Sequence, residues 1–174
     1  LSAGTLSGMR RPVHPAELLR AGQRLAIRGL EVQVVGVSHD AREPTQVVLS
    51  DGQRRFGMLT DLGMATAEVL ECYRAVAALV VEANHDSTML AGGPYPYFLK
   101  ARVGGSRGHL NNHQSAELVK QLDWGRMQHL VLAHLSEKNN SPQLARQTFV
   151  DTLGCDPDWL QVADQHSGLD WREI

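Results

Sequence analysis

The dipeptide Asp51-Gly52 lies between two short runs rich in apolar and β-branched residues, at positions 45–50 and 54–60. Aspartate followed by glycine in this setting is a strong signal for a β-hairpin, because the tight turns that join antiparallel strands need residues that tolerate positive φ. Residues 24–38, which precede this hairpin, alternate in polarity and predict two more strands. The first third of the chain is therefore expected to form antiparallel hairpins, which excludes a helical bundle.

From residue 65 onward, three segments with the apolar spacing of helices alternate with three short apolar runs that are expected to be buried strands. The helices are expected at 65–75, 113–122 and 142–153, and the strands at 77–82, 129–134 and 159–163. This order predicts a mixed α+β fold. We expect the whole chain, 1–174, to form one domain, because 174 residues are enough for one hydrophobic core.

Composition restricts the partners and the compartment. The net charge of −2 gives no overall attraction to nucleic acids or membranes, so a contact with nucleic acid must come from a local basic patch. The two cysteines, Cys72 and Cys155, are too far apart in sequence to suggest a cysteine zinc motif. No apolar run reaches the ~18 residues of a membrane span. The chain also opens without a signal peptide, so we expect a cytoplasmic protein with no membrane partner.

Four predicted strands end on side chains that can bind metal ions. These ends carry His39 with Asp40, Asp61, the segment 82–86, and His134. Loops at strand ends can aim several side chains at one point, so we expect these residues to converge. Imidazole nitrogen and carboxylate oxygen suit ions such as Zn²⁺ or Mn²⁺, which can lower the pKa of a bound water to about 7. Taken singly, a histidine at a strand end is by default a structural or surface histidine, and Asp61 by itself is more often a turn or cap residue.

The remaining histidines are expected to have no role in such a site. They are His14, His113, His129 and His166.

Five segments of the chain together are similar to the signature segments of a known family. They are, in chain order, VSHDAREP, LTDLG, EANHD, PYPYFLKARVGGSRGHLNN and LAHLSEKNNSP. The chain resembles, over nearly its whole length, the YycJ/WalJ-type metal-dependent DNA 5′-exonucleases of the metallo-β-lactamase fold. The resemblance implies an αββα sandwich, and we expect the early hairpins in one sheet and the later strands in the other.

The resemblance also implies roles for particular residues at a centre of two divalent ions, Zn or Mn. His39 matches a ligand of the first ion, Asp61 the aspartate that bridges both ions, and His134 the last ligand of the second. His109 falls in the stretch where related transfer-RNA 3′-processing enzymes have a histidine that assists the leaving group. His85 is a feature of this branch near the metals, either supporting a ligand or contacting phosphate. The predicted catalytic residues are therefore Asp61, His85 and His109.

One departure from the family is severe. The family carries an HxHxDH motif that supplies ligands to both ions, and this sequence contains no such motif. We therefore expect the sandwich to be incomplete at its N-terminal side, with an apolar sheet face left exposed. We also expect this chain to bind metal poorly and to be inactive by itself. A smaller departure is Asn111, where the branch usually has serine.

A group of aromatic and basic residues gives local support for a nucleic-acid substrate. Tyr95 and Tyr97 offer stacking faces, and Lys100, Arg102 and Arg107 offer contacts to phosphate. These three basic residues are the predicted substrate-binding residues, with DNA as the substrate. The alternative is a solvated loop whose tyrosines pack on the core.

The sequence therefore favours hydrolysis of a phosphodiester at a DNA 5′ end, in the 5′-to-3′ direction, by water activated at two metal ions. A first alternative is a small-molecule ester or lactam hydrolase on the same fold, which would need a narrow apolar pocket. A second alternative is a non-catalytic fragment that requires an upstream segment. The oligomeric state is not predicted.

Overall fold

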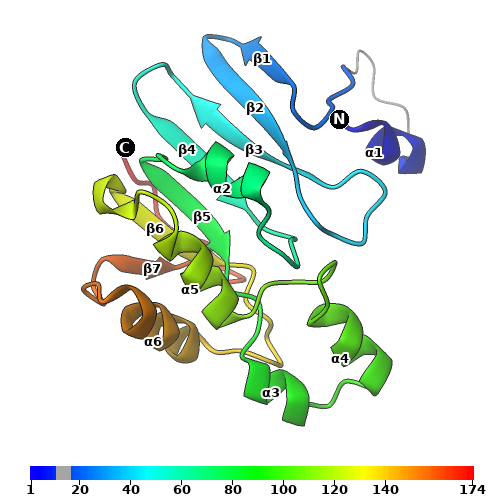
Figure 1. Ribbon diagram of the computed structural model, residues 1–174, viewed down its shortest axis with the longest axis vertical. Coiled ribbons are helices and arrows are strands. Elements are labelled where there is room, and N and C mark those ends of the chain that lie inside the picture. Colours follow the sequence, from blue (N-terminus) through cyan, green and yellow to red (C-terminus); the bar gives the residue numbers. More distant parts are fainter. Residues whose placement is uncertain (11–16) are drawn as a thin grey trace.

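The seven strands of the described residues form a single sheet in which neighbours follow the order of the chain (Figure 1). A computed structural model describes residues 1–10 and 17–174, so His14 lies outside the described residues. The strands are β1 (Arg24–Ile27), β2 (Leu30–Gly36), β3 (Thr45–Ser50), β4 (Arg55–Leu59), β5 (Ala78–Glu82), β6 (His129–Ala133) and β7 (Leu160–Val162). Strands β1 to β4 pair antiparallel, and β4 to β7 pair parallel.

The helices of the described residues are α1 (Ala3–Gly8), α2 (Ala67–Tyr73), α3 (Ser87–Gly92), α4 (Tyr97–Val103), α5 (Asn112–Lys120) and α6 (Pro142–Leu153), with a 3₁₀ turn at Trp124–Arg126. The three helices expected after residue 65 are present as α2, α5 and α6, and the described residues form α1, α3 and α4 in addition. Helix α6 begins as its sequence indicates, since the Ser141 hydroxyl accepts the Leu144 N–H and Pro142 occupies the first turn. It ends at Gly154 in the left-handed conformation, with φ of 66°.

Helices α2, α5 and α6 cover one face of the sheet, whereas α3 and α4 extend away from one end of it (Figure 1). The covered face supplies the apolar core, in which Leu79 and Leu132 of the central strands are fully buried against the helices. Phe149 of α6 and Tyr73 of α2 are buried from the helical side. This packing holds in place the parallel strands, and the candidate site lies at their C-terminal ends.

The predicted hairpin between β3 and β4 is confirmed, but its turn differs from the expected one. Only Gly52 has positive φ, at 93°, and the loop is lengthened because the Asp51 carboxylate accepts the N–H groups of Gln53 and Arg54. The two-residue turn with positive φ at both positions lies between β1 and β2 instead, at Arg28 and Gly29.

The expected division of the strands between two sheets is wrong. Strand β4 pairs directly with β5 in parallel, with Phe56 opposite Ala78, so the hairpins and the later strands are continuous. The second sheet of an αββα sandwich is not present among the described residues. The sheet face opposite the helices is apolar, as expected, and Met58 on it is 40% exposed.

The C-terminal tail lies over part of this second face. Leu169, Trp171 and Ile174 of the tail enclose a cavity of about 310 Å³ against Phe56 and Val80 of the sheet. Trp171 remains 99% exposed, so the tail covers the face only partly. No helix in the described ranges is both long enough and apolar enough to cross a membrane.

Candidate metal centre

Three residues that the sequence singled out meet at one end of the sheet. The Asp61 Oδ1 atom lies 3.8 Å from Nε2 of His39 and 3.8 Å from Nε2 of His134. These residues follow β4, β2 and β6 respectively, so three strand ends place them together. His109 lies between the two other histidines, with ring centroids 5.0 Å from His39 and 5.1 Å from His134.

Two of these residues have a backbone conformation that is uncommon for residues other than glycine. Asp61 has φ of 57° and His134 has φ of 56°, both in the left-handed region. This conformation costs of order 1 kcal/mol for a residue other than glycine, and it occurs mostly where surrounding contacts impose it, often at functional sites. Each residue directly follows the parallel core of the sheet, which turns its side chain toward the common point.

A fourth residue, Glu82 at the end of β5, joins the segments of the site. Its side chain is fully buried and accepts the backbone N–H groups of Asp61, Leu62 and Leu110, at 3.0, 3.2 and 2.9 Å. It also accepts Nδ1–H of His109 at 3.1 Å and of His134 at 3.2 Å. The sequence analysis noted Glu82 as part of a strand end but gave it no role. The available signal was an acidic residue closing an otherwise apolar buried strand.

Glu82 is ionised, and it fixes the protonation pattern of its neighbours. Burial by itself raises its pKa, but hydrogen bonds from His109, His134 and the Leu110 N–H outweigh burial and lower the pKa to about 2. The hydrogen bond to Glu82 raises the pKa of His134 against the opposing effect of burial, and the nearby Asp61 charge adds to the rise. An ionised carboxylate only accepts hydrogen bonds, so both histidines carry a proton on Nδ1.

In all three histidines of the site Nδ1 is therefore the hydrogen-bonded nitrogen. Nε2 faces Asp61 in His39 and His134, and Nε2 of His39 also lies 3.5 Å from Oδ1 of Asp40. Nδ1 of His39 donates to the Gly108 carbonyl at 3.0 Å, just as Nδ1 of His109 and His134 donate to Glu82. A histidine ligand in a metal site typically has this arrangement, in which one nitrogen is held by a hydrogen bond and the other is free for the ion.

The donor atoms fit a divalent ion. His39, Asp61 and His109 each offer one donor atom within 4.8 Å of the others, and Glu82, His109 and His134 form a second such group. We discount Glu82 as a ligand because its two oxygens already accept five hydrogen bonds. Without Glu82 the second group is not a ligand set, and His134 is connected to the centre through the 3.8 Å approach of its Nε2 to Asp61.

Glycines allow the loops of the site to approach closely. A Cβ atom at Gly63 would lie 2.5 Å from the Gly105 carbonyl oxygen and 2.6 Å from the Gly108 nitrogen. The loop that leads to His109 therefore crosses directly over the residue that follows Asp61 and Leu62. The Ser38 hydroxyl donates to the Ser106 carbonyl at 2.8 Å and ties the same loop to the segment of His39.

His85 is buried beside the site. It is 2% exposed, its Nδ1 is 3.3 Å from Oδ1 of Asn84, and burial lowers its pKa. Asn84 in turn donates to the His134 carbonyl at 3.0 Å. Such burial favours the supporting role over the phosphate contact among the two alternatives for His85.

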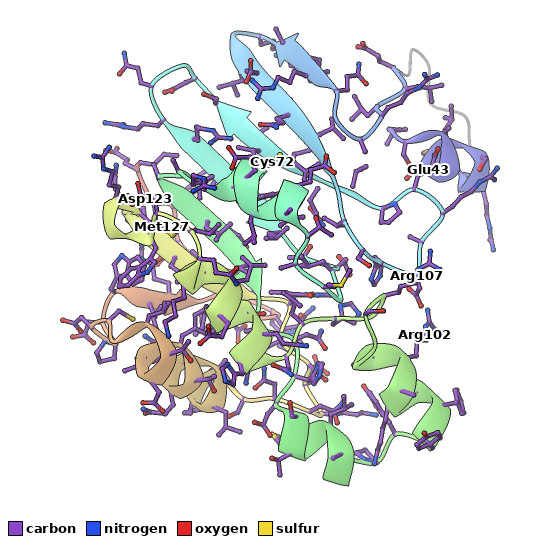
Figure 2. The ribbon with its side chains drawn as sticks, viewed as in Figure 1. Glu43, Cys72, Arg102, Arg107, Asp123 and Met127 are labelled. Carbon is purple, nitrogen blue, oxygen red and sulfur yellow. The ribbon has the colours of Figure 1, made fainter. Side chains whose placement is uncertain are left out.

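The three predicted substrate-binding residues are placed differently from one another. Arg102 lines a cavity of about 240 Å³ together with His39 and His109, and its guanidinium pairs with Asp40. Lys100 donates to the Ala91 carbonyl at 2.6 Å. Arg107 is exposed, and Figure 2 shows it with Arg102 on the side of the molecule that carries α4.

Comparison with known proteins identifies the class. Residues 4–135 match the model of the β-lactamase superfamily domain. The chain belongs to this superfamily, and its single mixed sheet with helices is the corresponding α+β fold. Within the superfamily it is a YycJ/WalJ-like protein, as the following relatives show.

Two curated relatives carry this likeness. The exodeoxyribonuclease YycJ of Bacillus anthracis is 35% identical over 124 residues, which are 71% of this chain and 47% of that protein. The exodeoxyribonuclease WalJ of Streptococcus pneumoniae serotype 2 (strain D39) is 31% identical over 155 residues, 89% of this chain and 55% of that protein. The chain thus spans about half the length of the curated relatives it matches.

Solved structures agree on the fold. The metallo-β-lactamase fold protein YhfI of Bacillus subtilis superposes with a TM-score of 0.64 at 16% identity, covering 90% of this chain and 55% of YhfI. Zn²⁺-bound PqqB of Methylobacterium extorquens gives a TM-score of 0.56 at 16% identity, covering 88% of this chain and 50% of PqqB. At such identities the likeness concerns the fold alone.

Proposed function

We propose that this chain carries half of the active site of a metal-dependent phosphodiester hydrolase that degrades DNA from its 5′ end. The observation that supports the proposal most is the position of the Asp61 carboxylate, 3.8 Å from Nε2 of both His39 and His134. A carboxylate between two imidazoles can belong to two ions at once, as a phosphodiester hydrolase with paired ions requires.

His39 would hold one ion, His134 the other, and Asp61 both. Nitrogen and carboxylate donors of this kind suit Zn²⁺ or Mn²⁺. The ions, when bound, would polarise the phosphoryl group and lower the pKa of a coordinated water. The protein contributes orientation, because Glu82 and the Gly108 carbonyl hold the imidazole rings through Nδ1.

His109 is placed to handle a proton. Its Nδ1–H is held by Glu82, and the ring lines both cavities beside the site. With Nδ1 held by Glu82, His109 could donate a proton from Nε2 to the departing oxygen. This is the role that the resemblance suggested for His109.

DNA is proposed as the substrate because the two relatives described above are named exodeoxyribonucleases. Arg102 and Arg107 would contact the phosphate backbone, although Arg102 must first exchange or share its partner Asp40. Lys100 is the weakest of the three candidates, since its ammonium group already donates to a carbonyl.

The test is degradation of an oligodeoxynucleotide labelled at its 3′ end, in the presence of Mn²⁺ or Zn²⁺. The chain is assayed alone and mixed with the N-terminal half of a YycJ or WalJ relative. We expect stepwise shortening from the 5′ end in the mixture, which is lost in Asp61→Ala and kept in Asp151→Ala, a change of an exposed aspartate of α6. Activity only in the mixture would support the fragment that needs an upstream segment. No shortening in either assay would overturn the proposal.

A further inference from the structure

The larger cavity of the site contains groups that none of the proposed metal-binding or proton-transfer roles uses. It has a volume of about 420 Å³, and His109 and His134 form its inner wall. The outer wall includes Tyr95 from the segment between α3 and α4, and Ser136 and Lys138 from the loop after β6. The volume lies within the range of about 300–1,000 Å³ typical of small-molecule sites.

Asn139 connects the two segments that form the outer wall, namely the segment around α3 and the loop after β6. Its backbone carbonyl accepts the Asp86 N–H at 2.8 Å, at the start of α3. A Cβ atom at Gly93 would lie 2.5 Å from Oδ1 of Asn139 and 2.7 Å from the Met89 carbonyl oxygen. Asn139 is fully buried, so its neighbour Lys138 and the nearby Tyr95 stand on a tightly packed support rather than on independent loops.

The chemistry of the lining fits one nucleotide. Tyr95 and Val103 offer an aromatic ring and an apolar side chain against which a base can stack. Lys138 and Ser136 offer an ammonium and a hydroxyl group to a phosphate. Glu137, the only carboxylate of the lining, would have to face the amino or hydroxyl groups of the nucleoside, since it would repel a phosphate.

We propose that this cavity binds the 5′-terminal nucleotide of the DNA as a nucleoside 5′-monophosphate unit, with its phosphate at Lys138 and its base at Tyr95. This inference rests on the proposed function, since it names which part of the substrate lies beside the histidines. The bond to be cleaved, on the 3′ side of this nucleotide, would then lie next to His109 and His134, and the occupant after cleavage would be the released mononucleotide.

Binding is measured directly, without hydrolysis, by isothermal titration of the chain with thymidine 5′-monophosphate, thymidine and inorganic phosphate. We expect Lys138→Ala to weaken binding of the monophosphate by about tenfold or more and to leave thymidine unchanged. Tyr95→Ala should weaken both ligands. The control Lys120→Ala, at the end of α5, should bind all three like the unchanged chain. Absence of monophosphate binding, or equal binding by Lys138→Ala, would overturn the proposal.

A second pair of variants tests the support of the cavity. Gly93→Ala should displace Asn139 or α3 and weaken binding of thymidine 5′-monophosphate, whereas Gly92→Ala meets nothing within 4 Å and should not. Equal binding by the two alanine variants would contradict the packed support.

Two outcomes distinguish the nucleotide site from the proposed function. If the protein binds the monophosphate through Lys138 but never shortens DNA, the proposed function is wrong and the nucleotide site is retained. If Lys138→Ala shortens DNA at the same rate as the unchanged chain, and 5′-phosphate and 5′-hydroxyl ends are degraded equally fast, only the nucleotide site is contradicted.

Discussion

Glu82 is the residue on which the geometry of the site depends most. A buried carboxylate is costly unless its oxygens are fully hydrogen-bonded, and here three backbone N–H groups and two imidazoles supply the partners. Sequence reasoning singled out His39, Asp61 and His134 because several predicted strands end on metal-capable side chains, and the family resemblance assigned their roles and added His109. It gave Glu82 no role because the sequence does not show which N–H groups a carboxylate at a strand end will accept. Those partners come from segments that are brought together only by folding.

The variant Glu82→Gln should destabilise the fold by about 2–3 kcal/mol near neutral pH, because an amide nitrogen cannot accept the N–H groups that the carboxylate accepts. The pKa of Glu82 is about 2 in the folded protein, below its ordinary value of 4.5. A lowered folded pKa means that the stabilisation is complete above pH 4.5 and is lost as the pH falls toward 2. Urea unfolding at pH 7, 4 and 3 measures this difference for the two proteins.

The matched control is Glu71→Gln, which changes an exposed glutamate of α2 paired with Arg74. Its effect should be small at every pH, since exposed ion pairs contribute about 0–1 kcal/mol. A difference between the Glu82→Gln variant and the unchanged chain that stayed constant from pH 7 to pH 3 would contradict the account of Glu82.

At the scale of elements, the loops of the site depend on backbone contacts that only glycine permits. Gly63→Ala should push the 104–108 loop away from the segment after Asp61 and destabilise the protein by about 1–3 kcal/mol. The displacement should also move the His109 ring, which is detectable as a shifted imidazole resonance. Gly125→Ala, in the 3₁₀ turn where a Cβ meets nothing within 4 Å, should leave both stability and the His109 resonance unchanged. A Gly63→Ala variant as stable as Gly125→Ala would show that the loops are not packed as described.

The helices and strands themselves were largely predictable, because each has a local cause. The Ser141-Pro142 start and the Gly154 end of α6 are signals of this kind, and so is the polarity alternation that becomes β2. Helix α1 was not anticipated, since Ala3–Gly8 has no amphipathic pattern and buries none of its residues. The turn of the β3–β4 hairpin differed because the Asp51 side chain competes for backbone N–H groups, an outcome that the dipeptide alone does not decide.

At the scale of the whole molecule, the arrangement of strands was harder to predict than the strands. Alternation shows that a strand has two different faces, but not which strand will be its neighbour. The direct pairing of β4 with β5 joins the hairpins to the parallel strands in one sheet, contrary to expectation. The family likeness predicted the α+β fold correctly. It also led us to expect an apolar second face of the sheet, and this face can be tested in solution.

That face should make the chain bind hydrophobic dyes and associate with itself. Met58 stands on it at 40% exposure between Val47 and Val80 of the neighbouring strands. Met58→Lys should reduce dye fluorescence and the concentration-dependent association seen by sedimentation velocity. The control Met64→Lys changes a methionine of similar exposure, 48%, that follows the Asp61 loop outside the sheet. An open apolar face would be contradicted if the chain stays monomeric and binds no dye. It would also be contradicted if Met58→Lys and Met64→Lys had equal effects.

The central claim is that Asp61, His39 and His134 form a centre for divalent ions. It is tested most directly by titrating the ¹⁵N-labelled chain with Zn²⁺ while following the histidine ring nitrogens by nuclear magnetic resonance. Because the chain lacks the HxHxDH ligands, we expect binding to be weak. As Zn²⁺ is added, the Nε2 resonances of His39 and His134 should shift together while their Nδ1 resonances keep the signature of a bound proton. Asp61→Ala should abolish the response, and Asp151→Ala should preserve it. A response from His113, His129 or His166 instead, or an Asp61→Ala variant that titrates like the unchanged chain, would contradict the claim.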